Sequence, residues 1–300
     1  MSESSITSLK ILSWNIEGLN TNNGECKMNM PGVLKTVNKF DVICIQETFE
    51  TEQSNLHVNG FTCFSSHRSY RHKRAKRGSG GVIMLVRNQF VKGVSKQKSV
   101  SDDILWLKFK KDFFGLESDL YISSCYMLPE NSSILTWRDL GVCDALEIDI
   151  TKYSSLGNIL ICGDLNARTG LLQDFVENDD RDHIPLPHAY TPDYFNQYRC
   201  NLDKTVNNYG EWLMSTCISA NLCTLNGRSC GDVLGNYTCY RKNSVSTLDY
   251  IIASKVLFDH FSYFKVLPFT LLSDHCPIST TSRINYKVQN KDKVETLKSC

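Results

Sequence analysis

Short apolar runs rich in β-branched residues recur along the chain, and most of them are bounded by Gly, Asn, Asp or Ser. Runs of about four to eight such residues are typical of β-strands. The pattern predicts strands at residues 9–14, 41–46, 80–86, 104–109, 120–126, 158–164, 246–253 and 263–269.

Helical patterns lie between some of these runs. Helices are predicted at residues 31–40, 135–153 and 207–222. Pro31 suits the first turn of the first helix. In the third, Leu213, Cys217 and Ile218 share one face at helical spacing, and we expect that face to be buried. Many strands with fewer helices predict an α+β fold in which two sheets form a β-sandwich flanked by helices.

No internal repeat or linker divides the 300-residue chain. Residues 167–206 show little periodicity and many polar, Pro and Asp residues, which predicts a long loop or a small insertion. We expect a flexible N-terminus at 1–8, one domain at 9–285 and a polar C-terminal tail at 286–300.

The charge is balanced overall, with 33 Lys plus Arg against 32 Asp plus Glu, so net charge gives no general attraction to nucleic acid or membrane. Residues 68–77, RSYRHKRAKR, nevertheless concentrate basic side chains. Such a loop either binds a polyanion or is merely solvated, and the pattern alone leaves both interpretations open.

The segments that would target a chain to a membrane or for secretion are not found. No run of about 18 apolar residues is present, so no membrane span is predicted, and MSESSITSLK lacks the apolar core of a signal peptide. The 13 cysteines include no C-x-x-C pair, and several lie in apolar runs. We interpret them as reduced, mostly buried cysteines of an intracellular protein.

Polar side chains interrupt or directly follow six of the apolar runs. They are Asn15, Glu17, Gln46, Glu47, Tyr126, Asp164, Asn166, Asp249, Asp274 and His275. One such position is commonly a turn, but buried carboxylates must be paired, hydrogen-bonded or bound to metal. Together these side chains offer oxygen ligands that suit Mg²⁺ or Mn²⁺, and an acid-rich site with one histidine suits metal-assisted hydrolysis of a phosphate ester.

The segment LLSDHCPIST, residues 271–280, places Asp274 and His275 side by side at the end of an apparent buried strand. Taken alone, the pair is better explained by a Ser-Asp turn with a surface histidine. The functional interpretation depends on the other polar residues at strand ends.

The ordered set SWNIEGL, QET, Tyr126 before Pro129, GDLNAR, LDYI and SDHCPI resembles the endonuclease/exonuclease/phosphatase superfamily, which includes apurinic/apyrimidinic endonucleases and pancreatic deoxyribonuclease. The resemblance spans about residues 9–280. It implies a four-layer α/β/β/α, deoxyribonuclease-like sandwich.

A narrower resemblance concerns residues 199–228 and 237–254, which are similar to the endonuclease domain of non-LTR, LINE-type retrotransposons. It marks an Arg/Asp/Asn/Gly run at Arg199, Asp203, Asn207 and Gly210. Since its arginine and aspartate are close in sequence, we expect them to clamp the long loop.

For the metal, the resemblance implies that Glu47 is the principal ligand of Mg²⁺, with Mn²⁺ as an alternative, assisted by Asn15 and Asp274. Glu17 stands where relatives often have Asp or Asn, so its role in metal binding stays open.

For the chemistry, the resemblance implies that Asp164 positions or deprotonates the attacking water and that Asn166 donates to the phosphoryl group. His275 contacts the scissile phosphate, Asp249 pairs with His275, and Tyr126 lies beside the phosphate. Tyr126 is followed by MLP, where many relatives have a Pro-Pro pair, so the local loop is expected to differ.

The resulting hypothesis is a Mg²⁺-dependent endonuclease that nicks DNA for target-primed retrotransposition. The alternatives are a phosphatase or RNA-directed phosphodiesterase of the same superfamily, and an inactive DNA-binding relic. The residues expected to contact DNA are Arg71, Lys73, Arg74 and Lys76 in the basic loop, and Arg241 and Lys242 in a predicted hairpin with its turn at 242–244.

The same hypothesis predicts a monomer in the nucleus, with DNA as its partner and no membrane contact. A reverse transcriptase encoded by the same element is a further possible partner, but none follows in this chain. A fragment, a truncated element copy and a retained endonuclease gene therefore all stay open.

Overall fold

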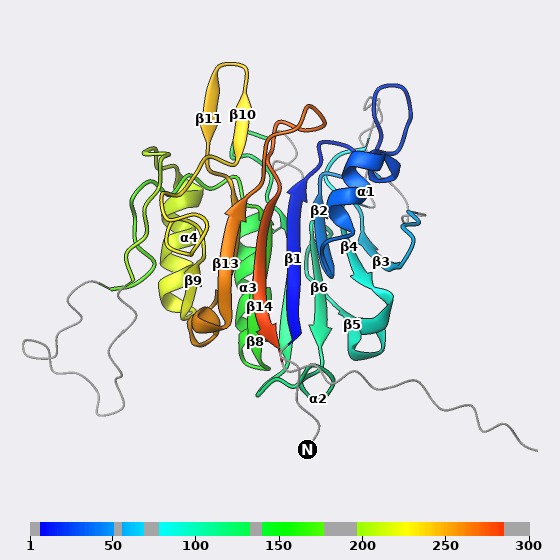
Figure 1. Ribbon diagram of the computed structural model, residues 1–300. Helices are drawn as coiled ribbons and strands as arrows, with labels where there is room; N and C mark the ends of the chain where they lie inside the picture. The colour runs from blue at the N-terminus through cyan, green and yellow to red at the C-terminus, as the bar shows by residue number, and fades with distance from the viewer. Residues whose placement is uncertain (1–6, 51–55, 69–77, 133–139, 177–196, 285–300) are drawn as a thin grey trace, which may run out of the picture.

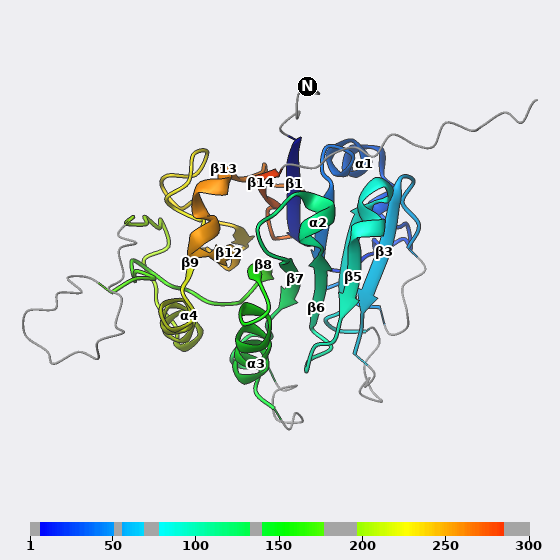
Figure 2. The same ribbon diagram turned by 90° about the horizontal axis from the view of Figure 1, so that it is seen from below.

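Two mixed sheets of six strands pack face to face (Figures 1 and 2). The structure is a computed structural model that describes residues 7–50, 56–68, 78–132, 140–176 and 197–284. The first sheet has the order β13-β14-β1-β2-β4-β3 and the second has the order β5-β6-β7-β8-β12-β9. In each sheet the two central parallel strands, β1 with β2 and β7 with β8, end at the same edge.

The strand bounds of the first sheet are β1 Thr7–Asn15, β2 Val42–Gln46, β3 Phe61–Ser66, β4 Val82–Arg87, β13 Phe261–Val266 and β14 Ile278–Ile284. Those of the second are β5 Val94–Gln97, β6 Ile104–Phe109, β7 Leu120–Tyr126, β8 Asn158–Asp164, β9 Leu222–Thr224 and β12 Asp249–Ser254. A separate hairpin consists of β10 Cys239–Arg241 and β11 Ser244–Ser246.

The helices are α1 Pro31–Val37, α2 Lys111–Phe114, α3 Val142–Ser154 and α4 Asn208–Ser219, with 3₁₀ turns η1 Lys27–Asn29, η2 Asn88–Gly93 and η4 Lys255–His260. Seen from below, α1 lies beyond one sheet, and α3 and α4 lie beyond the other (Figure 2). Among the described residues, no helix is long and apolar enough to cross a bilayer.

Strand β1 shows how the sequence creates these layers. Leu9 and Ile11 belong to the core between the sheets, whereas Leu12 and Trp14 belong to the cluster under α1. Side chains of a strand alternate between its faces, so a strand covered on both sides carries apolar residues on both of its faces. The order of layers is helix, sheet, sheet, helix, which confirms the predicted α+β sandwich.

The eight strands predicted from the apolar runs are present, with shifted bounds, and the three predicted helices overlap α1, α3 and α4. The strands β3, β5, β9 and β14 were not predicted; the first three each lie at an edge of a sheet, whereas β14 lies between β13 and β1. Edge strands such as VSKQ are half solvated and polar, so they give no apolar run. The prediction for Ile218 was wrong, because it is 37% exposed while Leu213 and Cys217 are buried.

The predicted strand leading into Asp274 and His275 was also wrong. Leu271 is 97% exposed, and β14 begins only at Ile278. His275 instead forms a single antiparallel bridge with Cys239 of the hairpin. Adjacent leucines indicate hydrophobicity but not burial, and this pair lies in the loop before β14.

Within residues 167–176 and 197–206 the chain has neither helix nor strand, as expected for the long loop, and residues 177–196 lie outside the described part. Residues 1–6 and 285–300 lie outside it as well, so the domain bounds stay a prediction. In the part of the chain that the structure describes, no cysteine forms a disulfide, and most of them are buried, including Cys44, Cys125 and Cys162.

Candidate active site

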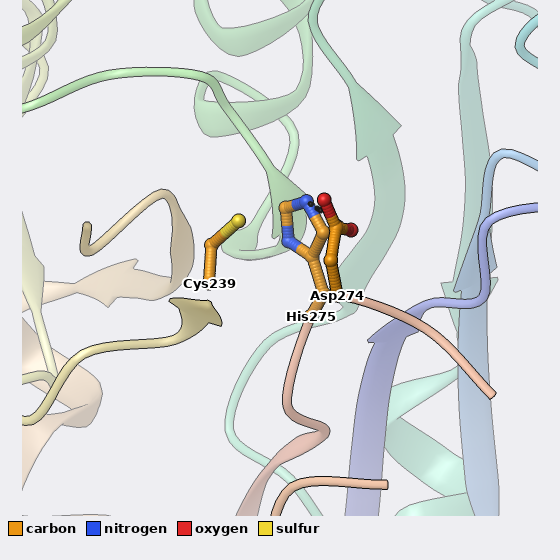
Figure 3. Close-up of side chains that lie close together, drawn as sticks. All are labelled: Cys239, Asp274 and His275. Carbon is orange, nitrogen blue, oxygen red and sulfur yellow. Dashed lines mark ion pairs between the residues drawn. The ribbon is translucent and has the colours of Figure 1, made fainter. Parts of the chain in front are cut away.

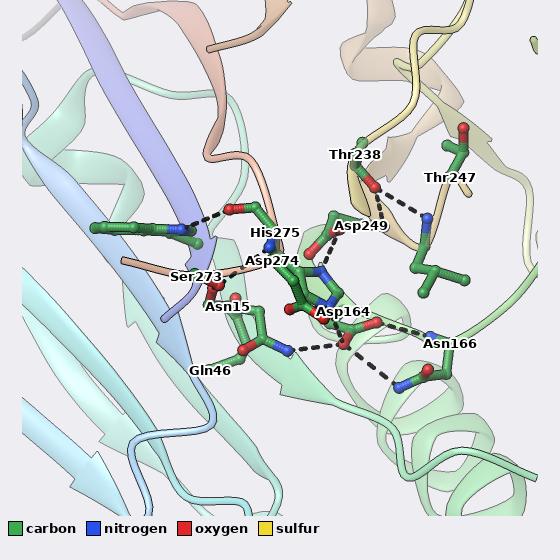
Figure 4. Close-up of polar contacts among 12 residues, drawn as sticks. Asn15, Gln46, Asp164, Asn166, Thr238, Thr247, Asp249, Ser273, Asp274 and His275 are labelled. Atoms are coloured by element: carbon green, nitrogen blue, oxygen red, sulfur yellow. Dashed lines mark hydrogen bonds and ion pairs between the residues drawn. The ribbon is translucent and has the colours of Figure 1, made fainter. Parts of the chain in front are cut away.

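The ends of the central strands bring the polar residues together at one end of the sandwich (Figure 4). In the first sheet Asn15 lies opposite Gln46 in the parallel pair β1–β2. In the second, Asp164 lies opposite Tyr126 on one side and Asp249 on the other. The site is therefore a consequence of strand register.

Asn15 connects the two sheets. Its Nδ2 donates to Oδ2 of Asp164 at 2.9 Å, and both residues are 1% exposed. Its Oδ1 accepts a hydrogen bond from the backbone N of Glu17 at 3.1 Å, and its carbonyl accepts one from Ser273 Oγ at 2.7 Å. The orientation of the amide is thus fixed by its neighbours.

Asn166 adopts a left-handed backbone conformation, with φ of 47°, in the turn after β8. Its backbone N donates to Asp164 Oδ1 at 3.0 Å, and its Nδ2 donates to the carbonyl of Met127 at 2.7 Å. Its own carbonyl accepts from Asn207 Nδ2 at 3.0 Å. Asparagine tolerates this conformation better than most residues, which explains an amide at this turn.

Asp164 is a buried carboxylate with several hydrogen-bond donors. Burial raises the pKa of this carboxyl to about 7, and the negative charges of Asp249 and Glu47 add to the shift. The charge of His275 and the backbone N–H of Asn166 oppose it. A carboxylate with a pKa near neutral can accept a proton at physiological pH.

His275 lies between three carboxylates. Its Nδ1 is 2.8 Å from Oδ2 of Asp249, while its Nε2 is 3.7 Å from Oδ2 of Asp164 and 3.6 Å from Oδ1 of Asp274. Burial alone would lower the pKa of the imidazole, but the charges of Asp249 and Asp164 outweigh it and hold this pKa well above its usual value. The pairing of Asp249 with His275, inferred from the sequence, is present.

The loop that holds His275 is anchored on both sides. Its carbonyl accepts a hydrogen bond from Trp14 Nε1 at 3.0 Å, and its backbone N donates to Ser273 Oγ at 3.1 Å. Across the site, Thr238 Oγ1 accepts from the backbone N of Asp249 at 3.1 Å. Ser273 and Thr238 were not singled out from the sequence, since hydroxyl residues beside strands are too common to carry a signal.

Glu47 and Tyr126 are hydrogen-bonded to each other at the site. Burial, the charges of Glu47 and Asp164 and a hydrogen bond to Glu47 raise the pKa of Tyr126 far above its usual value, so its hydroxyl stays protonated. The guanidinium of Arg68 lies 5.8 Å from the centre of the Tyr126 ring. Gln46 points elsewhere, since it is fully buried and bonds to Ser13 and Ser124.

Arg68 is the first residue of the basic segment, but it does not face solvent. It is 7% exposed and makes two hydrogen bonds to Asp103, at 2.8 and 3.0 Å. The four residues of this loop predicted to bind DNA, Arg71, Lys73, Arg74 and Lys76, lie outside the described residues.

The hairpin β10–β11 projects from the same end of the molecule as the site (Figure 1). Arg241 and Lys242 are exposed near its tip. Ser244 pairs with Arg241 within the ladder, so the turn is shorter than predicted. Arg241 also forms an ion pair with Asp274, with Nε 2.9 Å from Oδ2.

The predicted clamp on the long loop exists, but with another arginine. Asp203 accepts two hydrogen bonds from Arg168 of GDLNAR, at 2.8 and 2.6 Å, whereas Arg199 donates to Thr169 Oγ1 and to the carbonyl of Leu172. Gly210 packs against this segment so closely that a Cβ there would lie 1.9 Å from the carbonyl oxygen of Arg168.

The donor set fits a hard divalent cation. Asp164, Asp249 and Glu47 concentrate negative charge, and the charges of Asp249 and Glu47 raise the pKa of Asp164. A bound cation relieves such repulsion, and carboxylate and amide oxygens are the ligands that Mg²⁺ and Mn²⁺ prefer. Of the predicted ligands, Glu47 and Asn15 lie at the site, while Asp274 shares its carboxylate with Arg241.

Comparison with known proteins agrees with this geometry. The Endonuclease/Exonuclease/phosphatase family matches residues 12–275, from within β1 to His275. The chain belongs to this family. Its members are metal-dependent phosphoester hydrolases, and the segments that carried the resemblance in the sequence lie within the matched region, except that SDHCPI extends three residues beyond it.

Solved structures of the family share the fold. An AP endonuclease, LMAP from Leishmania major, superposes with a TM-score of 0.62 at 16% identity, over 94% of this chain and 91% of that chain. The 3′ phosphatase NExo from Neisseria, bound to a product DNA hairpin, has a TM-score of 0.58 at 14% identity, over 91% and 98%.

The endonuclease domain of TRAS1, a telomere-specific non-LTR retrotransposon, has a TM-score of 0.55 at 15% identity, over 93% of this chain and 100% of that chain. At these identities the likeness establishes the fold alone. No curated protein matches the chain by sequence.

Proposed function

We propose that this family member is a Mg²⁺-dependent endonuclease that nicks one strand of DNA and leaves a 3′-hydroxyl. The observation that supports hydrolysis most strongly is the contact between the two sheets, in which Asn15 holds Asp164 at 2.9 Å beside the pair formed by His275 and Asp249.

Each side chain has a role that follows from its position. Asp164, with a pKa raised to about 7, orients the attacking water and accepts its proton. His275 is held at Nδ1 by Asp249 and carries a proton at neutral pH, so its Nε2 is available to donate to a phosphate oxygen. Asn166 and the protonated Tyr126 are further donors beside that phosphate.

Glu47 and Asn15, with Asp274 as a third candidate, are the residues that would hold Mg²⁺ or Mn²⁺. When bound, such a cation offsets the charge of the phosphate and polarises its oxygens.

DNA is favoured over a small phosphate ester because of the hairpin β10–β11. It projects from the same end of the molecule as the site, its Arg241 pairs with Asp274 at 2.9 Å, and the next residue, Lys242, is exposed. A long polyanion can contact the site and the hairpin at once. The retrotransposon branch is supported by the segments at 199–228 and 237–254 and by the fold shared with the TRAS1 endonuclease domain.

On this proposal the chain acts in the nucleus as a monomer and nicks the target from which a reverse transcriptase would prime. A phosphatase is the second candidate, because the shared fold includes a 3′ phosphatase.

The test is conversion of supercoiled plasmid to the nicked circle with Mg²⁺, with Mn²⁺ and with EDTA, beside release of phosphate from a 3′-phosphorylated DNA hairpin and from inositol phosphates. We expect plasmid nicking that EDTA abolishes. Phosphate release without nicking would establish the phosphatase instead, and DNA binding without either activity would indicate an inactive relic.

A further inference from the structure

Three metal-binding side chains meet on the hairpin side of His275. A sulfur of Cys239, a carboxylate oxygen of Asp274 and a ring nitrogen of His275 all lie within 4.8 Å of one another (Figure 3). Nε2 of His275 and Oδ1 of Asp274 are 3.6 Å apart. Thiolate, imidazole and carboxylate together are ligands of Zn²⁺ rather than of Mg²⁺.

The backbone fixes this cluster. Cys239 and His275 form an antiparallel bridge, Tyr240 N donates to the carbonyl of Asp274 at 2.7 Å, and Cys276 N donates to the carbonyl of Thr238 at 2.7 Å. Strand β10 and residues 274–276 are thus held side by side. Cys239 and His275 are buried, at 0% and 2% exposed, so neither ligand has to be ordered when a metal binds.

Asp249 prepares the imidazole as a ligand. Its Oδ2 lies 2.8 Å from Nδ1 of His275, which places a proton on Nδ1 and directs Nε2 toward a metal. A carboxylate behind a histidine is the usual support of a zinc ligand, because it fixes the tautomer and increases basicity.

The three ligand atoms need to move only slightly closer together to bind zinc. Tetrahedral zinc with bonds of about 2.0–2.3 Å has ligand atoms roughly 3.5 Å apart. The side chain of Asp274 is 28% exposed and can supply the movement. Arg241 contacts Oδ2 of Asp274 and leaves Oδ1 directed toward His275, so the ion pair and a metal are compatible.

We propose that Cys239, Asp274 and His275 bind a thiophilic divalent cation such as Zn²⁺, and that this binding inhibits the enzyme. On binding, the Cys239 thiol and Nε2 of His275 each release a proton to solvent, and Nε2 coordinates the metal. His275 then has no proton to donate to a phosphate. The inhibitory part of the inference rests on the proposed function, whereas the binding part does not.

Cobalt tests the binding part without any activity. Co²⁺ replaces Zn²⁺ in such sites, and a cysteine ligand gives a sulfur-to-cobalt charge-transfer absorption. The exposed Cys200 and Cys230 are first replaced by Ser, so that they do not contribute. In this background we expect a saturable band at one Co²⁺ per chain that Zn²⁺ removes.

The matched variants are Cys239→Ser and Cys276→Ser. Cys276 is also buried and directly follows His275, but it is not in the cluster. The band should disappear in Cys239→Ser and persist in Cys276→Ser. Absence of the band in the background, or its persistence in Cys239→Ser, would overturn the proposed site. Circular dichroism verifies folding, and Cys239→Ala replaces Cys239→Ser if the latter does not fold.

The inhibitory part is tested by plasmid nicking in Mg²⁺ with chelator-buffered Zn²⁺. At a free Zn²⁺ that fills the site, the background and Cys276→Ser should lose at least about tenfold in rate, and Cys239→Ser should keep its rate. Equal inhibition of both variants would contradict regulation through Cys239. A protein that shows the cobalt band but nicks nothing would overturn the proposed function and the inhibition, and leave the metal site established.

Discussion

Asn15 and Asp164 lie 149 residues apart and in different sheets, yet Nδ2 of Asn15 donates to Oδ2 of Asp164 at 2.9 Å. The bond joins the ends of β1 and β8 and sets the distance between the two halves of the site. It also stabilises a carboxylate that burial would otherwise favour in its neutral form.

Replacing Asn15 by Ala should therefore reduce both activity and stability. Loss of a donor to a buried carboxylate costs about 1–3 kcal/mol, and nicking should fall by roughly 100-fold or more as Asp164 loses its position. Single-turnover nicking and urea denaturation measure the two effects. Asn158→Ala is the matched control, since Asn158 is at the other end of β8 and bonds to Ser118 at 2.8 Å. Equal loss of activity in both variants would contradict a specific role for Asn15.

His275 and Asp249 should behave as one unit. His275→Ala should reduce nicking by about 10²–10⁴-fold, as expected for a positioned proton donor. Asp249→Asn should cause part of that loss, because the 2.8 Å contact then no longer favours the charged imidazole. The double variant should be no slower than His275→Ala alone. Additive losses in single-turnover rates would show that Asp249 acts independently of His275.

The metal-free protein should lose stability as pH rises. The folded state raises the pKa of His275, so its stabilising contribution is complete below pH 6.5 and is lost as pH rises through the folded pKa. It also raises the pKa of Asp164 from 3.8 to about 7, so ionisation of this carboxyl destabilises the fold increasingly across that interval. Both effects lower the stability of the folded protein as pH rises.

In EDTA the Tm should therefore be higher near pH 6 than near pH 8.5, by several degrees if the difference exceeds about 1 kcal/mol. Differential scanning calorimetry across this range measures it. Asp164→Asn should flatten the part of the curve between pH 6 and 7. A Tm that is constant or rises with pH would refute the electrostatic description of the site.

The hairpin should affect where the DNA is cut. A Gly-Ser graft over residues 241–244 should leave folding intact, because the tip is exposed, and should change which plasmid positions are nicked more than the total rate. Primer extension maps the nicks. Lys242→Ser should reduce only DNA affinity and its salt dependence, by about one unit of slope. Arg241→Ser should also affect Asp274, its partner at 2.9 Å. Identical nick maps for the graft and the parent would place specificity elsewhere.

Substitution of Arg68 should affect stability, whereas substitution of the rest of its basic segment should affect DNA binding. Arg68→Ala leaves the fully buried Asp103 without its bidentate partner, and loss of one member of a buried pair costs about 3–5 kcal/mol. The combined Ser variant of Arg71, Lys73, Arg74 and Lys76 should keep stability and weaken binding of all DNA sequences alike. Denaturation and salt-dependent binding measure these effects. An unchanged salt slope would mean that the four residues are merely solvated.

The apolar runs predicted most of the inner strands, because a strand covered on both faces carries many apolar residues. β1, which ends at Asn15, and β2, which Glu47 follows, were found in this way, whereas the inner strand β14, ISTTSRI, was missed because Ser and Thr fill many of its positions. The edge strand β5, with the sequence VSKQ, carries no such signal. Its place in the sheet comes from pairing with the next strand, β6, which the four residues of β5 do not themselves encode.

The site was predictable as a set of residue types but not as a set of contacts. Strand ends carry carboxylates and amides, so Asp164 and Asn15 were found, yet nothing local indicates that one donates to the other. Likewise, Asp203 pairs with Arg168 and not with Arg199, although Arg199 is closer to it in the sequence. Local sequence does not indicate this contact either. Cys239 was interpreted as one of many core cysteines, and only the fold brings it to His275.

The central claim is that this geometry hydrolyses DNA to a 3′-hydroxyl, and end analysis of the nicked product tests it most directly. Plasmid treated with the protein and Mg²⁺ is offered to a DNA polymerase with a labelled nucleotide, with and without prior phosphatase treatment. We predict label incorporation without phosphatase for the wild type, none in EDTA, and at least about a 100-fold loss for Asp164→Asn. Extension that requires the phosphatase, or a rate unchanged in Asp164→Asn, would contradict the account.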